Sequence, residues 1–372
     1  MAFGSFFVSG GKRKGDNLVK MKNIVYDSSV AKPLPESGQT QRSDCGMKKF
    51  LALLLTLVLV LGMTACVNRE PETVQLRLAT GAPDSTYYTF GGYLGKHATE
   101  NADYLEVWAL ESVGSVDSCA QLQVGSVELA LCQSDVMVRA YEGGGEFAGE
   151  GARVENFSVV GALYREVMQI VTLDPTVKTV ADLKGRRVSV GANGTGKDKN
   201  VAEILEACSV AAQDVTLVYQ TIGESVAALK TGEVDAAFVL TELPCRALAE
   251  LAAARTTYVI GLEETCLRQL LRENSHYTAA AIPAGTYYAQ GEDAATVAVD
   301  VVLLARNDVP EESVYALAAD LYGGLAELAD VYPLCGQTAA PFGASVAVVP
   351  YHAGAARYFT EKGFTVPVLQ ED

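Results

Sequence analysis

The sequence predicts an α/β protein of two lobes, each a mostly parallel β-sheet flanked by helices, with a hinge between them. Three observations favour this class. Strands alternate with helices from Val74 onward, which is typical of βαβ units. The alternation restarts after an extended segment at 167–173. A late apolar run at 296–305 offers a second strand that could cross between the lobes.

The first lobe begins with a strand at 74–80, where apolar and polar residues alternate before a turn at 81–83. Asp84 or Ser85 is expected to cap the helix that follows, at 86–100. The same reading predicts strands at 105–110, 127–131 and 157–163, and helices at 116–124 and 135–141.

In the second lobe, a short helical turn at 180–185 precedes a strand at 187–191. Helices are predicted at 199–208 and 225–230, strands at 215–219 and 234–240, and a late helix at 311–331. If 167–173 and 296–305 are the crossing strands, the predicted boundaries are 74–173 plus 296–372 for the first lobe and 174–295 for the second.

Composition limits the partners of this 372-residue chain, which is 49% hydrophobic and carries a net charge of −16. Such a protein repels nucleic acid and anionic lipid headgroups. With three histidines and no C-x-x-C pair, the sequence argues against a zinc site of the usual Cys/His spacing, and no metal or cofactor is expected. The cysteines beyond Cys66 leave disulfides open, while Cys119 and Cys208 lie in helical patterns and are candidates for small buried side chains.

The stretch LALLLTLVLVLGMTACVNR, at 51–69, indicates a secretory signal. Two lysines precede an apolar run that is shorter than the roughly 20 residues a membrane-spanning helix needs, and small residues follow it. Cys66, directly after them, makes the stretch similar to a bacterial lipoprotein signal at 47–65, in which this cysteine is acylated and anchors the protein to the membrane. A plain transmembrane anchor is the alternative.

Residues 1–46 do not fit this pattern, because a signal peptide should begin the chain. They are interpreted as an over-long gene start at Met1, with translation beginning at Met47, or as a disordered extension. Residues 66–73 would then form a tether to the first lobe.

Loops at the carboxyl ends of the predicted strands are the expected ligand site, because ligands of such sheets bind there. Gly194-Thr195-Gly196 also opens a helix, whose free N–H groups and positive end suit an anion. The chain lacks a G-x-x-x-x-G-K-[ST] nucleotide loop. The candidate ligand-binding residues are Thr80, Gly81, Tyr87, Tyr88, Gly114, Ser115, Val116, Gln133, Ser134, Asn193, Thr195, Gly196, Lys197, Thr241 and Glu242.

The ordered motifs resemble the TAXI family, the solute-binding proteins of TAXI-type TRAP transporters, over nearly all of 74–366. The motifs are Thr80-Gly81 with Tyr87-Tyr88, Gly114-Ser115-Val116, Gln133-Ser134-Asp135, the D-L-K-G segment 182–191, the glycine loop 192–196 and the segment 352–363. Departures occur at Lys197, where a threonine or serine is common, and at Ser118, where an asparagine is frequent.

The resemblance implies a type II periplasmic-binding-protein-like fold that closes about a hinge. It also implies an extracytoplasmic lipoprotein that captures a small organic anion or amino acid, glutamate-like or dicarboxylate, and delivers it to a TRAP-type membrane permease. A sensor that passes ligand occupancy to a membrane receptor is the alternative. No nucleophile elbow or H-E-x-x-H motif is present, so an enzyme is not expected.

For several of these residues, a structural role is the alternative to contact with a ligand. Tyr87 and Tyr88 are expected to close over a ligand, or one of them to pack in the core. Asp135 is interpreted as a helix N-cap. Lys197 would neutralise a ligand carboxylate or be solvated, and Glu242 would pair with Lys197 or bind an ammonium group. Gln133 and Ser134 suit a carboxylate as uncharged donors, and His352 is expected to be structural.

Overall fold

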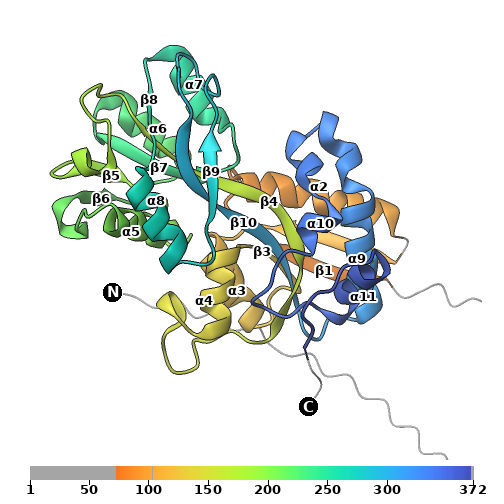
Figure 1. Cartoon of the computed structure of the whole chain (residues 1–372). Helices are drawn as coiled ribbons and strands as arrows, with labels where there is room; N and C mark the ends of the chain where they lie inside the picture. Colours follow the sequence, from red (N-terminus) through yellow and green to blue (C-terminus); the bar gives the residue numbers. More distant parts are fainter. Residues whose placement is uncertain (1–72, 103, 370–372) are drawn as a thin grey trace, which may run out of the picture. The chain divides into compact units, whose positions relative to one another are not determined.

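The computed structural model describes residues 73–102 and 104–369 (Figure 1). The predicted extension 1–46, the signal 47–65, the lipidation site Cys66 and nearly all of the tether lie outside the described residues. The described residues belong to one compact unit. None of their helices combines the length and apolar character that a membrane crossing requires.

The first lobe opens with the three parallel strands of its sheet, in the order β2-β1-β3. Alternating burial along β1 packs Leu76 and Leu78 into the core. The predicted cap is confirmed at Ser85, whose side chain accepts a hydrogen bond from the Tyr88 backbone N–H. The elements are β1 (Val74–Ala79), α2 (Thr86–Asn101), β2 (Leu105–Leu110), α3 (Ser115–Gln123), β3 (Leu129–Gln133), α4 (Ser134–Glu142) and η1 (Gly145–Phe147).

Two long antiparallel strands, β4 (Phe157–Thr172) and β10 (Ala294–Arg306), join the lobes. Figure 1 shows them side by side, running from the first lobe into the second. The predicted strands at 157–163 and 167–173 are therefore one strand, because burial continues on both sides of the single exposed residue, Arg165. On the first-lobe side β10 pairs with β3, and on the second-lobe side β4 pairs with β7.

The second lobe repeats the arrangement with parallel strands in the order β7-β5-β6. Strand β8 adds to β4, and β9 adds to β10, both antiparallel. The elements are η2 (Val180–Leu183), β5 (Arg187–Ser189), α5 (Lys197–Ala207), η3 (Ala212–Asp214), β6 (Thr216–Val218), α6 (Ile222–Thr231), β7 (Ala236–Thr241), α7 (Arg246–Ala254), β8 (Tyr258–Ile260), α8 (Glu264–Glu273) and β9 (Thr278–Ile282).

The chain returns through β10 to the first lobe and ends in helices there (Figure 1). The helix predicted at 311–331 ends earlier, at Gly323, where two consecutive glycines weaken it and a 3₁₀ segment follows. His352 caps the last helix by accepting from the Gly354 N–H through Nδ1 at 3.3 Å. The elements are α9 (Glu311–Gly323), η4 (Leu325–Asp330), η5 (Pro333–Gln337), α10 (Ala340–Gly343) and α11 (Ala353–Glu361).

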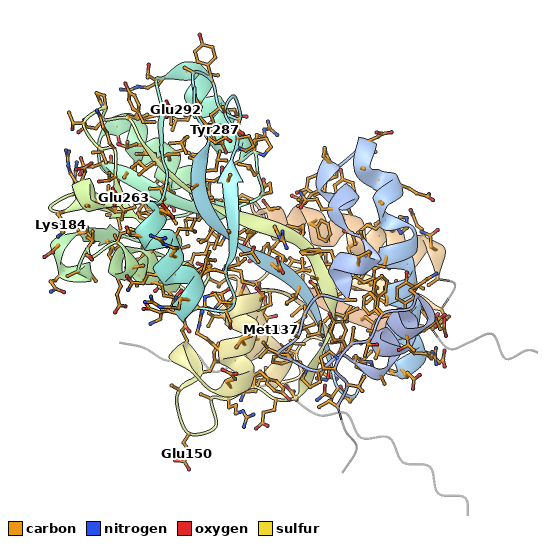
Figure 2. All side chains as sticks on the ribbon, viewed as in Figure 1. Met137, Glu150, Lys184, Glu263, Tyr287 and Glu292 are labelled. Atoms are coloured by element: carbon orange, nitrogen blue, oxygen red, sulfur yellow. The ribbon has the colours of Figure 1, made fainter. Side chains whose placement is uncertain are left out.

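The buried apolar side chains form separate clusters in the two lobes. One core cluster runs from Leu76 to Tyr164 and resumes at Val301, and two others lie between Val167 and Val299. Figure 2 shows Met137 inside the first lobe, while Glu150 and Lys184 project from the surface. The two-lobe α/β class with a periplasmic-binding-protein-like sheet is confirmed, and the boundary residues of the lobes stay a prediction.

The cysteines among the described residues are all free thiols. Cys119 is buried, and its Sγ lies 3.6 Å from that of Cys132. Cys208 is only half-buried at the end of α5. Burial raises the pKa of the Cys132 thiol well above its usual value, so this sulfur behaves as a small apolar group.

Candidate functional site

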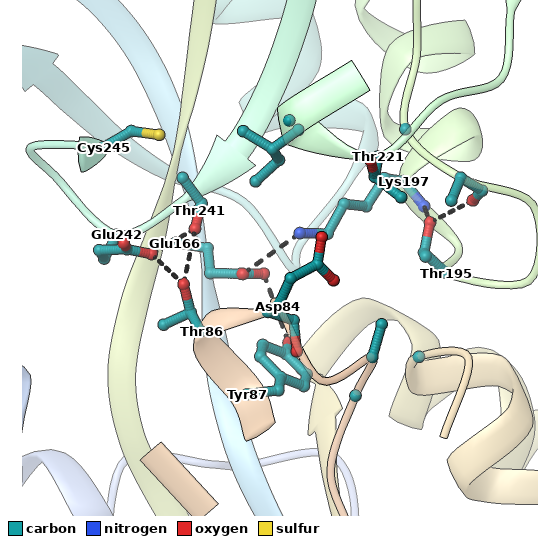
Figure 3. A pocket seen from close by; sticks show the side chains of 18 of the residues that line it. Asp84, Thr86, Tyr87, Glu166, Thr195, Lys197, Thr221, Thr241, Glu242 and Cys245 are labelled. Atoms are coloured by element: carbon teal, nitrogen blue, oxygen red, sulfur yellow. Dashed lines mark hydrogen bonds and ion pairs between the residues drawn. The ribbon is translucent and has the colours of Figure 1, made fainter. Parts of the chain in front are cut away.

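A cleft of about 640 Å³ lies where the carboxyl ends of the parallel strands of both lobes meet. In the first lobe the loops after β1 and β2 line it, and in the second lobe the loops after β5, β6 and β7 do so. Because the helix that follows each strand begins near the carboxyl end of that strand, several helix N-termini lie around the cleft. Figure 3 shows the lining side chains from close by.

Helix N-termini of both lobes face this cleft, among them those of α2, α3, α5, α6 and α7. Ser85 and Thr221 cap α2 and α6 through their side chains. In contrast, α3 and α5 begin at Gly114 and Gly196, which have no side chain to cap them. A helix start without an N-cap side chain keeps free N–H donors and a positive dipole end, so α3 and α5 present donors for an anion from each lobe; in α5 the Lys197 N–H already donates to Thr195 Oγ1 at 3.4 Å.

The two glycine-capped ends lie close to each other. A Cβ at Gly114 would approach the Cα of Thr195 to 3.1 Å, and Gly196, with φ +84°, would place a Cβ 2.6 Å from a methyl carbon of Val136. Glycine is therefore needed at both positions for the lobes to come this close. A ligand carboxylate here would meet backbone donors of both lobes.

Glu166, on the crossing strand β4, is the most buried charge of the cleft, with no exposed surface. Its Oε1 accepts from Lys197 Nζ at 3.3 Å, and its Oε2 accepts from the Tyr87 hydroxyl at 3.3 Å (Figure 3). Burial raises the pKa of Glu166 to about 7; the Lys197 charge opposes this rise and the Glu242 carboxylate adds to it. The carboxyl is therefore poised between its charged and neutral forms near neutral pH.

Glu242 follows β7 and links the second lobe to the first. Its Oε2 accepts from the Thr86 hydroxyl at 2.6 Å and from the Thr241 hydroxyl (Figure 3). Among the described residues, no lysine or arginine forms an ion pair with Glu242. The predicted pair of Glu242 with Lys197 is wrong, because Lys197 extends to Glu166 and to the Leu240 carbonyl instead.

A buried polar network joins the lobes beside the cleft. Asp135 accepts from Arg139 and Asn200, both at 2.9 Å, and from the Gln133 side chain at 3.2 Å. Burial alone would raise the pKa of Asp135, but the Arg139 and His276 charges and the hydrogen bonds from Asn200 and Arg139 hold it below its ordinary value. The predicted N-cap role of Asp135 is wrong: this residue lies inside α4, whose N-cap is Gln133.

The structure brings nine of the fifteen predicted ligand residues to the cleft wall. They are Gly81, Tyr87, Gly114, Ser115, Gln133, Thr195, Lys197, Thr241 and Glu242. Of the predicted tyrosine pair, Tyr87 points into the cleft and bonds Glu166, while Tyr88 is exposed and is not part of the wall.

The other predicted residues lie nearby but outside the wall: Thr80, Val116, Ser134, Asn193 and Gly196. The Thr80 hydroxyl donates to the Leu110 carbonyl at 2.6 Å, and Ser134 accepts from the Asp300 N–H. These two side chains form hydrogen bonds with backbone groups of the first lobe and its crossing strand.

Sequence reasoning missed Glu166, Thr86, Thr221 and Tyr332, which all line the cleft. One signal for Glu166 exists. It lies in the mostly apolar strand sequence FSVVGALYREVMQIVT, at 157–172, where a buried carboxylate has to be satisfied by other parts of the chain. No comparable pattern marks Thr86 or Tyr332.

A sequence model described as the NMT1-like family matches residues 78–363. This match overturns the resemblance to the TAXI family and, with it, the TRAP-type permease.

Several solved structures are similar to the chain. The alkanesulfonate-binding protein SsuA from Xanthomonas axonopodis pv. citri bound to MOPS is 16% identical (TM-score 0.44; 78% of this chain and 91% of that one). The periplasmic aliphatic sulphonate binding protein SsuA from Escherichia coli is 17% identical (TM-score 0.44; 79% and 91%). PhnD1 from Prochlorococcus marinus (MIT 9301) in complex with methylphosphonate is 12% identical (TM-score 0.44; 71% and 91%).

Proposed function

The chain belongs to the NMT1-like family, and we propose that it is an extracytoplasmic solute-binding protein that captures a small organic anion or amino acid, glutamate-like or dicarboxylate, and delivers it to a membrane permease. The observation that carries the proposal is the cleft of about 640 Å³ with wall residues from both lobes. Its volume suits a small organic molecule.

The donor sets favour a ligand with a carboxylate. The starts of α3 and α5 come from different lobes and lie close to each other at the cleft, so an anion that contacts both contributes to closing the lobes. The backbone of Lys197 stands at the start of α5, and its ammonium group brings a positive charge into the cleft beside Glu166. A protein with a net charge of −16 needs such a local positive field to hold an anion.

Closure about the crossing strands is the mechanism we propose. β4 and β10 are the long strands that run through both lobes, and their pairing is common to both halves of the sheet. A ligand that bonds both lobes shifts the open–closed equilibrium by its differential affinity for the closed state. The predicted boundaries, 74–173 plus 296–372 and 174–295, form part of this proposal.

Thermal-shift screening of the purified protein against L-amino acids and C4–C5 dicarboxylates tests the capture step. A ligand at 100 times its Kd stabilises the folded state by about 2.7 kcal/mol, which raises Tm by several degrees. We expect Lys197→Ala to abolish the shift and Lys184→Ala, an exposed lysine outside the cleft, to keep it. Failure of every compound to raise Tm would contradict the proposal.

The membrane anchor is a separate part of the proposal and rests on the sequence at Cys66. In cells, incorporation of labelled palmitate into the protein should be lost on Cys66→Ser and kept on Cys119→Ser, whose cysteine is buried. Equal labelling of both variants would contradict acylation at Cys66.

A further inference from the structure

The floor of the cleft holds more hydrogen-bond acceptors than donors. Glu166 and Glu242 bring two carboxylates, and Lys197 is the cation beside them. Two of the three ammonium hydrogens of Lys197 already serve Glu166 and the Leu240 carbonyl. A second ligand carboxylate placed here would face two protein carboxylates, of which only Glu166 is paired with the lysine.

Four hydroxyl groups around this floor are also committed. Tyr87 donates to Glu166, and Thr86 and Thr241 donate to Glu242. Thr195 donates to the Ala192 carbonyl at 2.6 Å. Since a hydroxyl has a single hydrogen, none of these four has a donor left for a ligand in this conformation.

Gln133 supplies an independent observation. Its side-chain amide nitrogen donates to Asp135 and Asn200, both at 3.2 Å, which fixes the amide orientation. The other end, Oε1, is buried and has no hydrogen-bond donor within the described residues, although Gln133 lines the cleft. A buried acceptor without a donor is costly, and a donor group on a ligand is one way to satisfy it.

The charges at the exposed side of the cleft do not change this balance. Arg246 forms an ion pair with Glu250 at 2.9 Å, so these two largely cancel, and Asp84 adds a further carboxylate. The cleft therefore has two ends of different character: positive helix N-termini at α3 and α5, and acceptors at Glu166, Glu242 and Gln133.

We propose that Glu166, Glu242 and Gln133 form a subsite for a protonated amine, so that the ligand is an amino-bearing carboxylate and not a dicarboxylate without nitrogen. Its carboxylate meets the starts of α3 and α5, and its ammonium group supplies three donors to the three acceptors. This inference rests on the proposed function and narrows its ligand class.

The number of protons exchanged on ligand binding distinguishes the two ligand types, because one type releases protons and the other takes them up. Lys197, Tyr87 and Glu242 are the charged or titratable groups that face Glu166, and Tyr164 lies on the same strand. The buried tyrosines have pKa values raised well above 10 and stay neutral at pH 7. An ammonium group beside Glu166 lowers its pKa from about 7, so binding releases a proton, whereas a second carboxylate raises the pKa and binding takes a proton up.

The experiment is isothermal titration calorimetry of the purified protein at pH 7 with ligands matched except for the amine. The panel holds the twenty L-amino acids and 4-aminobutyrate, with glutarate, succinate, propionate and butyrate as the analogues without nitrogen. We expect at least one amine-bearing compound to bind roughly 10-fold or more tightly than its analogue. Repeating the titration in phosphate and in Tris buffer gives the number of protons exchanged, which we expect to be a net release.

Two variants locate the subsite. Glu242→Gln should reduce the preference for the amine to roughly 3-fold or less, because it removes the carboxylate that has no cation of its own. Glu292→Gln, an exposed glutamate outside the cleft (Figure 2), should keep the full preference.

Each result has a defined meaning. Glutarate or succinate binding as tightly as its amino analogue, or binding with proton uptake, overturns the amine subsite and leaves the proposed capture of an organic anion standing. If no compound of either type binds, both proposals are overturned.

Discussion

Two carboxyl groups of this molecule are buried to the same extent, and each accepts a hydrogen bond from one basic side chain, yet their ionisation differs. Asp135 is 1% exposed and next to Arg139, and its pKa is held below the ordinary value. Glu166 is 0% exposed and next to Lys197, and its pKa is raised to about 7. Burial is therefore not what separates them.

The difference lies in the charges and donors that surround each carboxylate, and the His276 charge adds to that of Arg139 in lowering the pKa of Asp135. Asp135 receives hydrogen bonds from a guanidinium and two amides at 2.9–3.2 Å. Glu166 receives two longer ones, both at 3.3 Å, and has Glu242 as a repelling neighbour. The Asp135 carboxylate is thus well satisfied by donors from both lobes, whereas Glu166 keeps part of its bonding capacity for another group.

The largest expected effect comes from making the same change at both positions. Asp135→Asn leaves the Arg139 charge partly buried with only Glu146 as its ion-pair partner, and should lower the free energy of unfolding by about 3 kcal/mol. Glu166→Gln should be nearly neutral or stabilising at pH 8, because it removes a carboxyl that is costly to ionise. Urea unfolding at pH 8 measures both.

Glu150→Gln, at an exposed surface position, is the control for loss of a charge alone, and should change the unfolding free energy little. Equal destabilisation by Asp135→Asn and Glu166→Gln would show that the two buried carboxyls are equivalent and would break the comparison.

The pH dependence of stability provides the next largest effect. Because the pKa of Glu166 is raised from 4.5 to about 7 on folding, the unfolded chain loses this proton first as the pH rises. The stabilising contribution is complete below pH 4.5 and is lost between pH 4.5 and about 7, by about 3 kcal/mol in all. Asp135 acts in the opposite sense, since its lowered pKa removes stability as the pH falls below its ordinary value.

The measurement is the difference in unfolding free energy between the wild type and Glu166→Gln from pH 4.5 to 8. Taking the difference matters because burial lowers the pKa of His352, which makes stability rise with pH in part of the same range. A difference that stays constant across the range would mean that Glu166 is ionised at an ordinary pKa.

Much of the fold is predictable from the sequence because the periodicity of strands and helices is local. The alternation from Val74 and the Ser85 cap are examples, and the structure confirms both. The continuity of β4 is not local: Arg165 is exposed within the strand, and only pairing with β10 and β7 holds the chain extended through it. No element is predicted between Cys245 and 296, where α7, β8, α8 and β9 form.

The site is predictable only in part, for a related reason. Loops at strand ends can be located from the strand pattern, which is why Gly114, Thr195 and Lys197 reach the cleft. The partner of a charge depends on tertiary distance, so the Lys197–Glu166 pair, between residues 31 apart in the chain, cannot be deduced from either segment alone. The same holds for the bond between Thr86 and Glu242, 156 residues apart.

The smallest expected effect sharpens the comparison by removing one of the two donors of Glu166. Tyr87→Phe deletes a hydrogen bond of 3.3 Å that favours the charged carboxylate, so the pKa of Glu166 should rise further above 7, by roughly half a pH unit. The cost to stability should stay below about 1 kcal/mol, since the bond is long. Carbon-13 NMR of the glutamate carboxyl groups measures the shift, with the Glu166 signal identified by its loss in Glu166→Gln. A fall in the pKa of Glu166 in Tyr87→Phe would mean that the tyrosine hydroxyl accepts a hydrogen bond from a protonated Glu166. Glu166 would then have one donor fewer than the structure gives it, and its surroundings would differ even more from those of Asp135.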